Sequence, residues 1–111
     1  MPNWLLLATA IAFEVTATMF LRASDGLTKL WPTVVVIVGY VASFFLLSLI
    51  LRTGTPTGII YAIWSAFGIA LVTILGVMLF DDHISVLTGI GLVVVMIGVV
   101  LIQIGNPSGV G

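Results

Sequence analysis

The sequence predicts an all-α integral membrane protein with four transmembrane helices in each chain. Of its 111 residues, 61% are hydrophobic and only 6% are charged, and the mean hydropathy is +1.39. Soluble domains carry about 25% charged residues, so this chain lacks the polar surface that a folded protein needs in water. A hydrocarbon core of about 30 Å requires about 20 apolar residues of helix. Four segments meet this requirement: 4–21, 32–51, 57–80 and 84–104.

Each apolar segment is bounded by residues that end a helix or remain in water. Arg22 and Lys29 lie in the polar loop after the first segment, and Pro32 suits the first turn of the second helix, where its missing N–H is not needed. Residues 52–56 separate the second segment from the third, and residues 81–83 separate the third from the fourth. We therefore expect a single four-helix transmembrane domain over residues 1–111.

Composition and charge exclude several classes of function. The formal net charge is −1, so the chain has no basic face that could bind nucleic acid. It has no cysteine, which excludes disulfides and thiolate metal sites. The sequence contains no phosphate-binding loop, nucleotide fingerprint or haem motif, and His83 is expected in a solvated turn rather than in a metal site or proton relay. We therefore expect no enzymatic activity, no cofactor and no metal.

The basic residues give only a weak preference for one orientation in the membrane. Arg22 and Lys29 lie on one side of the predicted bundle, and Arg52 lies on the other. Basic residues near the spans set orientation, so a bias of two against one permits insertion in both orientations. Four helices are also too few to enclose a solute path with two gates, and many transporters use inverted repeats for this purpose. We therefore expect an antiparallel homodimer in a lipid bilayer.

Glu14 is the only acidic or basic residue inside the four apolar segments. A charged residue at the centre of a membrane helix costs about 2.5–3.5 kcal/mol on translocon scales, so it is retained mainly where it faces a cavity or a partner. A carboxyl group that can bind either a proton or a cation, but not both at once, would couple outward cation movement to inward proton movement. The alternative is a protonated Glu14 that only hydrogen-bonds to a neighbouring helix. Its neighbours at helical spacing are Leu7, Ala10, Ile11, Ala17, Thr18 and Leu21.

Aromatic residues lie at helical spacing within the second and third segments. Tyr61 and Trp64 share one face of the third helix, and Gly68 continues that face. The second helix carries Tyr40, Ser43 and Phe44 on a comparable face. Aromatic faces attract quaternary cations by about 2 kcal/mol or more when the site is desolvated. Together with Glu14 they would bind an apolar cation, although aromatic residues in a membrane bundle can also serve packing alone.

The fourth segment has glycines on one face and no charged residue. Gly91 and Gly98 are seven residues apart, so they lie on the same side of a helix. Small residues let membrane helices approach closely. This face is expected to form the dimer interface, with packing inside one chain as the alternative.

At these residues the chain resembles the small multidrug resistance family of bacterial proton-coupled exporters. The resemblance covers nearly the whole chain, and its most specific part lies around the start of the third helix. It rests on residues 12–15 (AFEV), 26–32 (GLTKLWP), 40–44 (YVASF), 56–58 (PTG) and 61–65 (YAIWS).

The resemblance implies a function and a set of site residues. Members of this family are four-helix proteins that work as antiparallel dimers in the bacterial inner membrane, and their membrane glutamate binds protons and substrate alternately. It follows that Glu14 would bind both, and that Tyr61 and Trp64 would line the pocket. The further expected substrate contacts are Leu7, Ala10, Ile11, Ala17, Thr18, Tyr40, Ser43 and Phe44.

Two positions bear on the branch of the family and on its motion. Guanidinium exporters typically carry tryptophan three residues after the glutamate, whereas this chain has Ala17, and exporters of polyaromatic cations typically have small residues there. The resemblance therefore favours a proton-coupled antiporter that exports lipophilic and quaternary ammonium cations. Ala66 stands where many members have a glycine in a bend of the third helix. We expect Gly68 to act as the hinge and conformational exchange to be slower.

Other functions remain open at this point. Within the family, the chain could export guanidinium or polyamines, or form one half of a heterodimer. In a different class, it could be a non-transporting assembly or regulatory subunit. Replacement of Glu14 by Gln separates these classes, because it should abolish pH-dependent cation binding in a transporter but mainly disturb assembly in a regulatory subunit.

Overall fold

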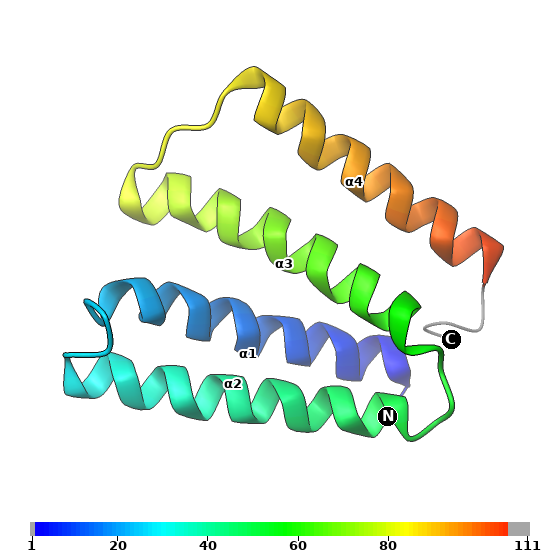
Figure 1. Ribbon diagram of the computed structural model, residues 1–111, viewed down its shortest axis with the longest axis horizontal. Helices are drawn as coiled ribbons and strands as arrows, with labels where there is room; N and C mark the ends of the chain where they lie inside the picture. The colour runs from blue at the N-terminus through cyan, green and yellow to red at the C-terminus, as the bar shows by residue number, and fades with distance from the viewer. Residues whose placement is uncertain (1, 107–111) are drawn as a thin grey trace.

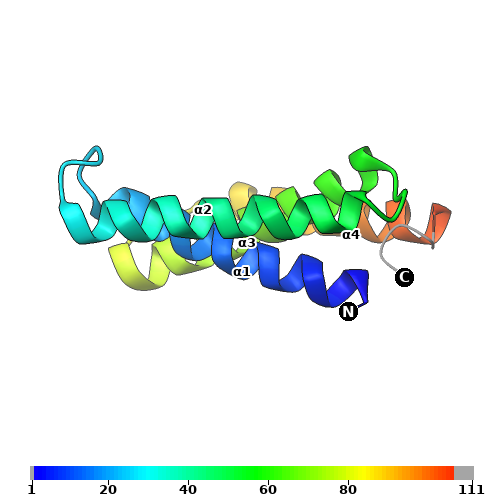
Figure 2. The same ribbon diagram turned by 90° about the horizontal axis from the view of Figure 1, so that it is seen from below.

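The chain forms a flat array of four long helices in a computed structural model that describes residues 2–106. The helices lie in the order α2, α1, α3, α4 across the array in Figure 1. Both ends of the described chain lie at the same end of the helices (Figure 1). The molecule measures 41 × 35 × 18 Å, and Figure 2 shows the thin dimension. Each helix is long and apolar enough to cross a membrane. Their bounds are α1 Asn3–Ala23, α2 Leu30–Leu51, α3 Thr57–Phe80 and α4 Val86–Gly105.

The helix ends differ from the predicted segments by up to two residues. α3 begins and ends where the sequence predicts. α2 begins two residues before Pro32, which still lies in the first turn, where its missing N–H leaves no helical hydrogen bond unmade. α4 begins two residues later than predicted because the Ser85 side chain caps it by accepting a hydrogen bond from the N–H of Thr88 at 3.1 Å. Residues 107–111, which follow the fourth predicted segment, lie outside the described part.

α1 and α2 pack closely through small side chains and a buried hydrogen bond. Gly39 lies directly against α1: a Cβ atom built there would be 2.8 Å from the Cβ of Ala17 and 3.1 Å from the carbonyl oxygen of Phe13. One turn further on, the Ser43 hydroxyl donates to the carbonyl of Ala10 at 2.7 Å, and Ser43 is buried. Small residues of this kind allow close approach between membrane helices. The two helices therefore form a tight hairpin.

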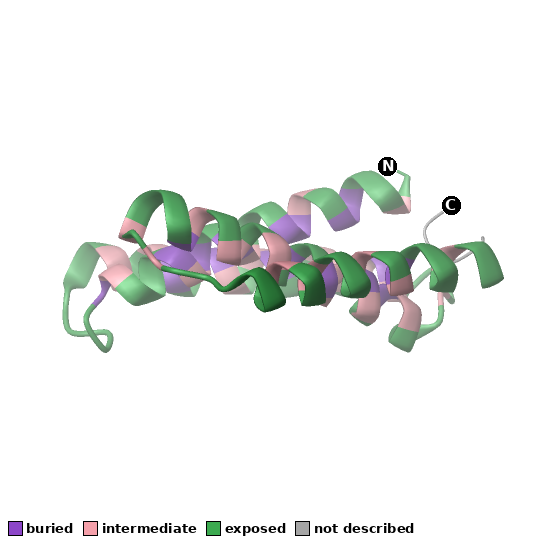
Figure 3. Cartoon of the chain, turned by 90° about the horizontal axis from the view of Figure 1, so that it is seen from above, coloured by how far each residue is buried: buried purple, intermediate pink, exposed green. Residues whose placement is uncertain are grey.

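The hydrophobic core lies between α1, α2 and α3. Ile50 from α2 and Ile60 from α3 are fully buried, and Leu7 and Ile11 of α1 belong to the same cluster. α4 packs on α3 and contributes one buried side chain among its described residues, Val99. Figure 3 shows α4 exposed along almost its whole length. The single chain is thus a packed unit of three helices with a fourth helix attached to its side.

Candidate functional site

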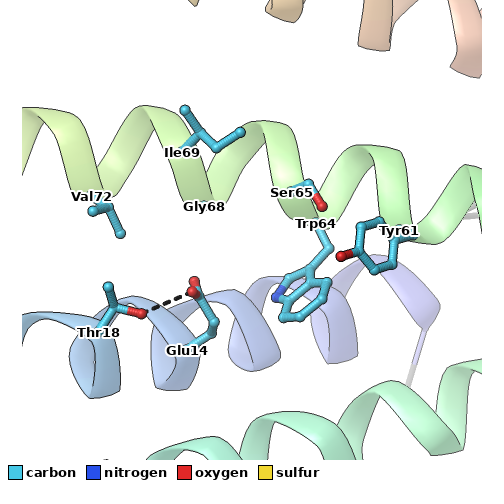
Figure 4. Close-up of a pocket in the computed structure, with 8 residues that line it drawn as sticks. All are labelled: Glu14, Thr18, Tyr61, Trp64, Ser65, Gly68, Ile69 and Val72. Carbon is cyan, nitrogen blue, oxygen red and sulfur yellow. Dashed lines mark hydrogen bonds between the residues drawn. The ribbon is translucent and has the colours of Figure 1, made fainter. Parts of the chain in front are cut away.

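A cavity of about 340 Å³ lies between α1 and α3 (Figure 4). α1 contributes one acidic and one hydroxyl side chain, and α3 contributes residues from about three turns of its inner face. Aromatic side chains lie toward one end of the cavity and aliphatic side chains toward the other. Its lining residues are Glu14, Thr18, Tyr61, Trp64, Ser65, Gly68, Ile69 and Val72.

Glu14 projects from α1 toward α3 and has one oxygen committed and one free. Its Oε1 accepts a hydrogen bond from the Thr18 hydroxyl at 3.0 Å. Thr18 Oγ1 also lies 2.7 Å from the Tyr40 hydroxyl; since the Thr18 proton goes to Glu14, Tyr40 is the donor in this second bond. The other oxygen, Oε2, is buried and has no hydrogen-bond partner among the described residues. A buried acceptor without a hydrogen bond costs free energy. A proton or a cation bound at this oxygen would satisfy it.

Gly68 makes the approach of the carboxylate to α3 possible. A Cβ atom at this position would lie 3.1 Å from Oε2 of Glu14, closer than an ordinary contact. α3 runs as one continuous helix through Ala66 and Gly68. The hinge role of Gly68 and the slower exchange attributed to Ala66 stay predictions.

The aromatic residues form an edge-to-face cluster centred on Trp64. Its ring centroid lies 5.4 Å from that of Tyr61 at an interplanar angle of 89°, and 5.6 Å from that of Phe44 at 71°. Trp64 Nε1 is buried and has no partner within the described chain. Tyr61 and Phe44 are both more than half exposed in the single chain. The cluster thus presents aromatic surface beside a carboxylate, an arrangement that suits an organic cation.

The structure separates the predicted substrate contacts into two groups. Glu14, Thr18, Tyr61 and Trp64 line the cavity, while Tyr40 reaches it through Thr18 and Phe44 through Trp64. Gly68, which was predicted as a hinge and not as a substrate contact, also lines the cavity. The other predicted contacts are buried in helix packing away from the lining: Leu7, Ala10, Ile11, Ala17 and Ser43. Their role in substrate binding stays a prediction.

Sequence reasoning missed three lining residues on α3. Ser65, Ile69 and Val72 follow Tyr61 at spacings of four, eight and eleven, so they continue its face of the helix. The same periodicity that grouped Tyr61 with Trp64 would have found them. Gly91 and Gly98 on α4 are not used for packing within the chain, because a Cβ atom built at either would meet nothing within 4 Å. The intrachain alternative for these two glycines is therefore not supported.

A second missed feature is an ion pair at the end of α1. The sequence placed Arg22 in the polar loop after the first segment and residue Asp82 in the short separator before the fourth, with no contact between them. Instead, Arg22 donates two hydrogen bonds to the Asp82 carboxylate, at 2.6 and 2.8 Å, and its guanidinium lies 4.3 Å from the ring centroid of Phe80. These hydrogen bonds hold the pKa of Asp82 below its usual range. The clue available in the sequence was that both residues lie on the same side of the membrane.

Comparison with known proteins supports the same interpretation. A sequence model of the family described as "Small Multidrug Resistance protein" matches residues 2–103. A multidrug transporter of Pseudomonas aeruginosa is 43% identical, with 94% of each chain covered. The multidrug resistance protein mmr of Mycolicibacterium paratuberculosis is 40% identical over 92% of this chain and 95% of its own length. The quaternary ammonium compound-resistance protein QacE of Escherichia coli is 38% identical, with 94% of each chain covered.

These relatives come from bacteria and match this chain over nearly their full length, and all four helices of this chain can span a bilayer. The chain is therefore a multi-pass protein of the bacterial inner membrane. The match over almost its full length shows that it belongs to the Small Multidrug Resistance family.

Proposed function

We propose that this protein exports lipophilic and quaternary ammonium cations in exchange for protons, and that both bind at Glu14. The observation that carries the proposal is the free Oε2 atom of Glu14, which is buried beside a cavity edged by Tyr61 and Trp64. A carboxylate at this depth needs a positive partner, because an isolated charge in a low-dielectric environment is costly. A proton and an organic cation both meet that need.

Competition between the two ligands gives the coupling. When the cation lies against Glu14, the carboxylate is ionised and the aromatic faces of Tyr61 and Trp64 contact the organic groups. When a proton binds, the carboxyl group is neutral and the cation loses its main attraction. The two ligands therefore exclude each other, and outward movement of one drives inward movement of the other.

The packing of Ala17 supports assignment to the branch that exports large organic cations rather than to the guanidinium branch. Ala17 is fully buried, and its Cβ packs against the backbone of Gly39. A tryptophan at this position, as guanidinium exporters typically have, would not fit between α1 and α2 as they pack here. The names of the relatives, a quaternary ammonium compound-resistance protein and two multidrug proteins, support the same substrate class.

An antiparallel homodimer completes this proposal. One chain leaves Tyr61 and Phe44 exposed beside the cavity, so the cavity wall is incomplete on that side. α4 is exposed, and its Gly91 and Gly98 offer a face on which another helix can pack closely. A second, inverted copy would supply the missing wall and a second path to the opposite side of the membrane.

The test is cation-driven proton movement in proteoliposomes. Wild-type protein should move protons inward when tetrapropylammonium moves out, and Glu14→Gln should abolish this flux because amide nitrogen and oxygen bind neither a proton nor a cation in the same way. Glu14→Asp keeps the charge and serves as the matched control, with flux retained at a different pH dependence. Flux driven by guanidinium alone would assign the protein to the other branch, and equal flux from wild type and Glu14→Gln would refute the proposal.

A further inference from the structure

A regular seam between α1 and α3 runs from the cavity toward loop 81–85. Three residues of α1, each four apart, face three residues of α3 with the same spacing. Glu14 meets Gly68, and Thr18 and Val72 line the cavity one turn further on. One turn beyond those, Arg22 and Gly76 are joined through Asp82, which touches both of them. The seam thus has an open middle and a closed end.

The closed end is fixed by several independent contacts around Asp82. A Cβ atom at Gly76 would lie 2.5 Å from Oδ2 of Asp82, so glycine leaves the space in which this side chain lies. The backbone N–H of Asp82 donates to the carbonyl of Gly76 at 3.1 Å, and Asp81 ends α3 in the left-handed conformation with φ 57°. Arg22 then reaches across from α1 with both guanidinium nitrogens. These contacts hold the Asp82 side chain against the end of α3, where it binds Arg22 of α1.

We propose that the Arg22–Asp82 ion pair is a gate: it closes the cavity toward the side of loops 24–29 and 81–85, and it must open for cation to pass there. This inference rests on the proposed function of the cavity. The pair lies on the continuation of the seam, so a cation that leaves Glu14 in this direction passes Thr18 and Val72 and then meets Arg22. The positive guanidinium repels the cation, and its link to Asp82 holds the two helices together.

At the opposite end of α1, the described residues form no ion pair between α1 and α3. There Asn3 donates hydrogen bonds to the hydroxyls of Thr53 and Thr55, at 3.1 and 3.2 Å. These groups are neutral, and they connect α1 to the loop between α2 and α3 rather than across the cavity seam. Tyr61, on the lining nearer to that end, is 57% exposed. In this conformation each chain therefore closes its cavity at the Arg22 end, and among the described residues no ion pair closes the other end.

The ion pair is suited to opening and closing because it is accessible to water. The Arg22 and Asp82 side chains are 47% and 39% exposed. Exposed ion pairs contribute little net stability, since solvation compensates each charge when they separate. The bidentate geometry nevertheless makes the closed state specific, because a planar guanidinium matches a carboxylate in one orientation. Such a contact can be broken and re-formed within each transport cycle.

The experiment locks the gate with a reversible cross-link. The native chain has no cysteine, so the double variant Arg22→Cys/Asp82→Cys offers a bis-methanethiosulfonate reagent two thiols on each chain. Because the two copies are antiparallel, cross-linking locks one pair on each side of the membrane, and proton-coupled turnover in proteoliposomes should fall to the level of protein-free liposomes. Reduction of the cross-link should restore turnover. The single-cysteine variants, treated with the same reagent, are the matched controls and should keep their turnover.

A second variant removes the pair instead of locking it. Asp82→Asn should raise the proton leak in the absence of cation by about fivefold, the upper range for loss of an exposed ion pair. Asp81→Asn removes the same charge one residue away and tolerates the left-handed backbone, so it should leave the leak unchanged. Unchanged turnover after cross-linking, or an Asp82→Asn leak equal to that of Asp81→Asn, would overturn the gate. Failure of the wild type to transport tetrapropylammonium would instead refute the proposed function itself.

Discussion

The α1–α2 hairpin and the α3–α4 pair differ sharply in how they are packed. Between α1 and α2, Gly39 and Ala17 bring the backbones close together, and the Ser43 hydroxyl is satisfied inside the interface. Between α3 and α4, Val99 is the one α4 residue that is buried in the described structure, and the groove between these helices is lined by apolar side chains alone.

This difference assigns separate mechanical roles to the two halves. The hairpin is a firm platform that holds Glu14, Thr18 and Tyr40 in a hydrogen-bonded chain. α3 meets that platform across a cavity and is tied to α1 at the Arg22–Asp82 pair. Few buried contacts mark the parts of a protein that move or bind a partner at low cost. We therefore expect α3 and α4 to move relative to the hairpin during transport.

The largest expected effect comes from Gly39→Leu. Because a Cβ atom at this position already meets the Cβ of Ala17 at 2.8 Å, a leucine must push α1 and α2 apart. Overpacking of this kind costs about 1–3 kcal/mol, and backbone contacts leave little room for relaxation. The stability of the detergent-solubilised protein, followed by circular dichroism during titration with a denaturing detergent, should fall accordingly.

The matched substitution on the loosely packed half is Gly91→Leu. An added side chain there meets nothing within 4 Å of its Cβ in the single chain, so the helical fold should survive. The dimer should weaken instead, as measured by size-exclusion chromatography with light scattering. Equal loss of fold in both variants would contradict the division into a tight and a loose half.

The second-largest effect is expected at the contact between the two halves. Gly68→Ala places a methyl group 3.1 Å from Oε2 of Glu14 and displaces the carboxylate from its position beside the cavity. The affinity for tetrapropylammonium should fall by about fivefold, comparable to the loss of one hydrogen bond. Gly58→Ala on the same helix has open space around its Cβ and is the control. Calorimetric titration of both variants distinguishes a local effect at Glu14 from a general effect of alanine on α3.

A smaller effect is expected from Tyr40→Phe, which alters the platform alone. Loss of the Tyr40 hydroxyl removes the hydrogen bond that orients the Thr18 hydroxyl toward Glu14. A typical net contribution of about 1 kcal/mol predicts up to fivefold weaker cation binding, with the fold and the dimer unchanged. Equilibrium binding at several pH values tests this, and binding identical to wild type at all of them would remove Tyr40 from the site.

The smallest effect concerns the pH response of the ion pair. Arg22 lowers the pKa of Asp82 in the folded state. The ion pair therefore stabilises the closed contact fully above an ordinary aspartate pKa of about 3.9, and this stabilisation is lost as the pH falls through the lowered pKa. Asp82→Asn should therefore change the proton leak by the same factor at about pH 6 and at about pH 9. A factor that varied over this range would mean that another group controls the gate.

The helices could be predicted from the sequence, but the neighbours of each helix face could not. Length and hydrophobicity determine the four spans, and the start of α4 was misplaced because the Ser85 cap was not recognised. Spacings of three, four and seven grouped Ala17 with Glu14. In the structure α1 lies between α2 and α3, so Ala17 faces α2 while Glu14 faces α3. Helical periodicity identifies a face of a helix, but it does not say which partner covers each edge of that face.

The ion pair shows a second limit of sequence reasoning. Arg22 and Asp82 are sixty residues apart, and their meeting depends on the turn at Asp81 and on the space left by Gly76. Neither condition has a periodic signal. Glu14, by contrast, was identified from one property, a carboxylate in an apolar segment, because the cost of such a group points to function.

The most direct test of the central claim is the number of protons released when a cation binds. Calorimetric titration of the wild-type protein with tetrapropylammonium, repeated in buffers of different ionisation enthalpy, gives this number at each pH. If a proton and a cation share Glu14, binding at a pH where the site is protonated must release protons, and Glu14→Gln must release none. Cation binding to the wild type without any proton release across the whole pH range would contradict the account.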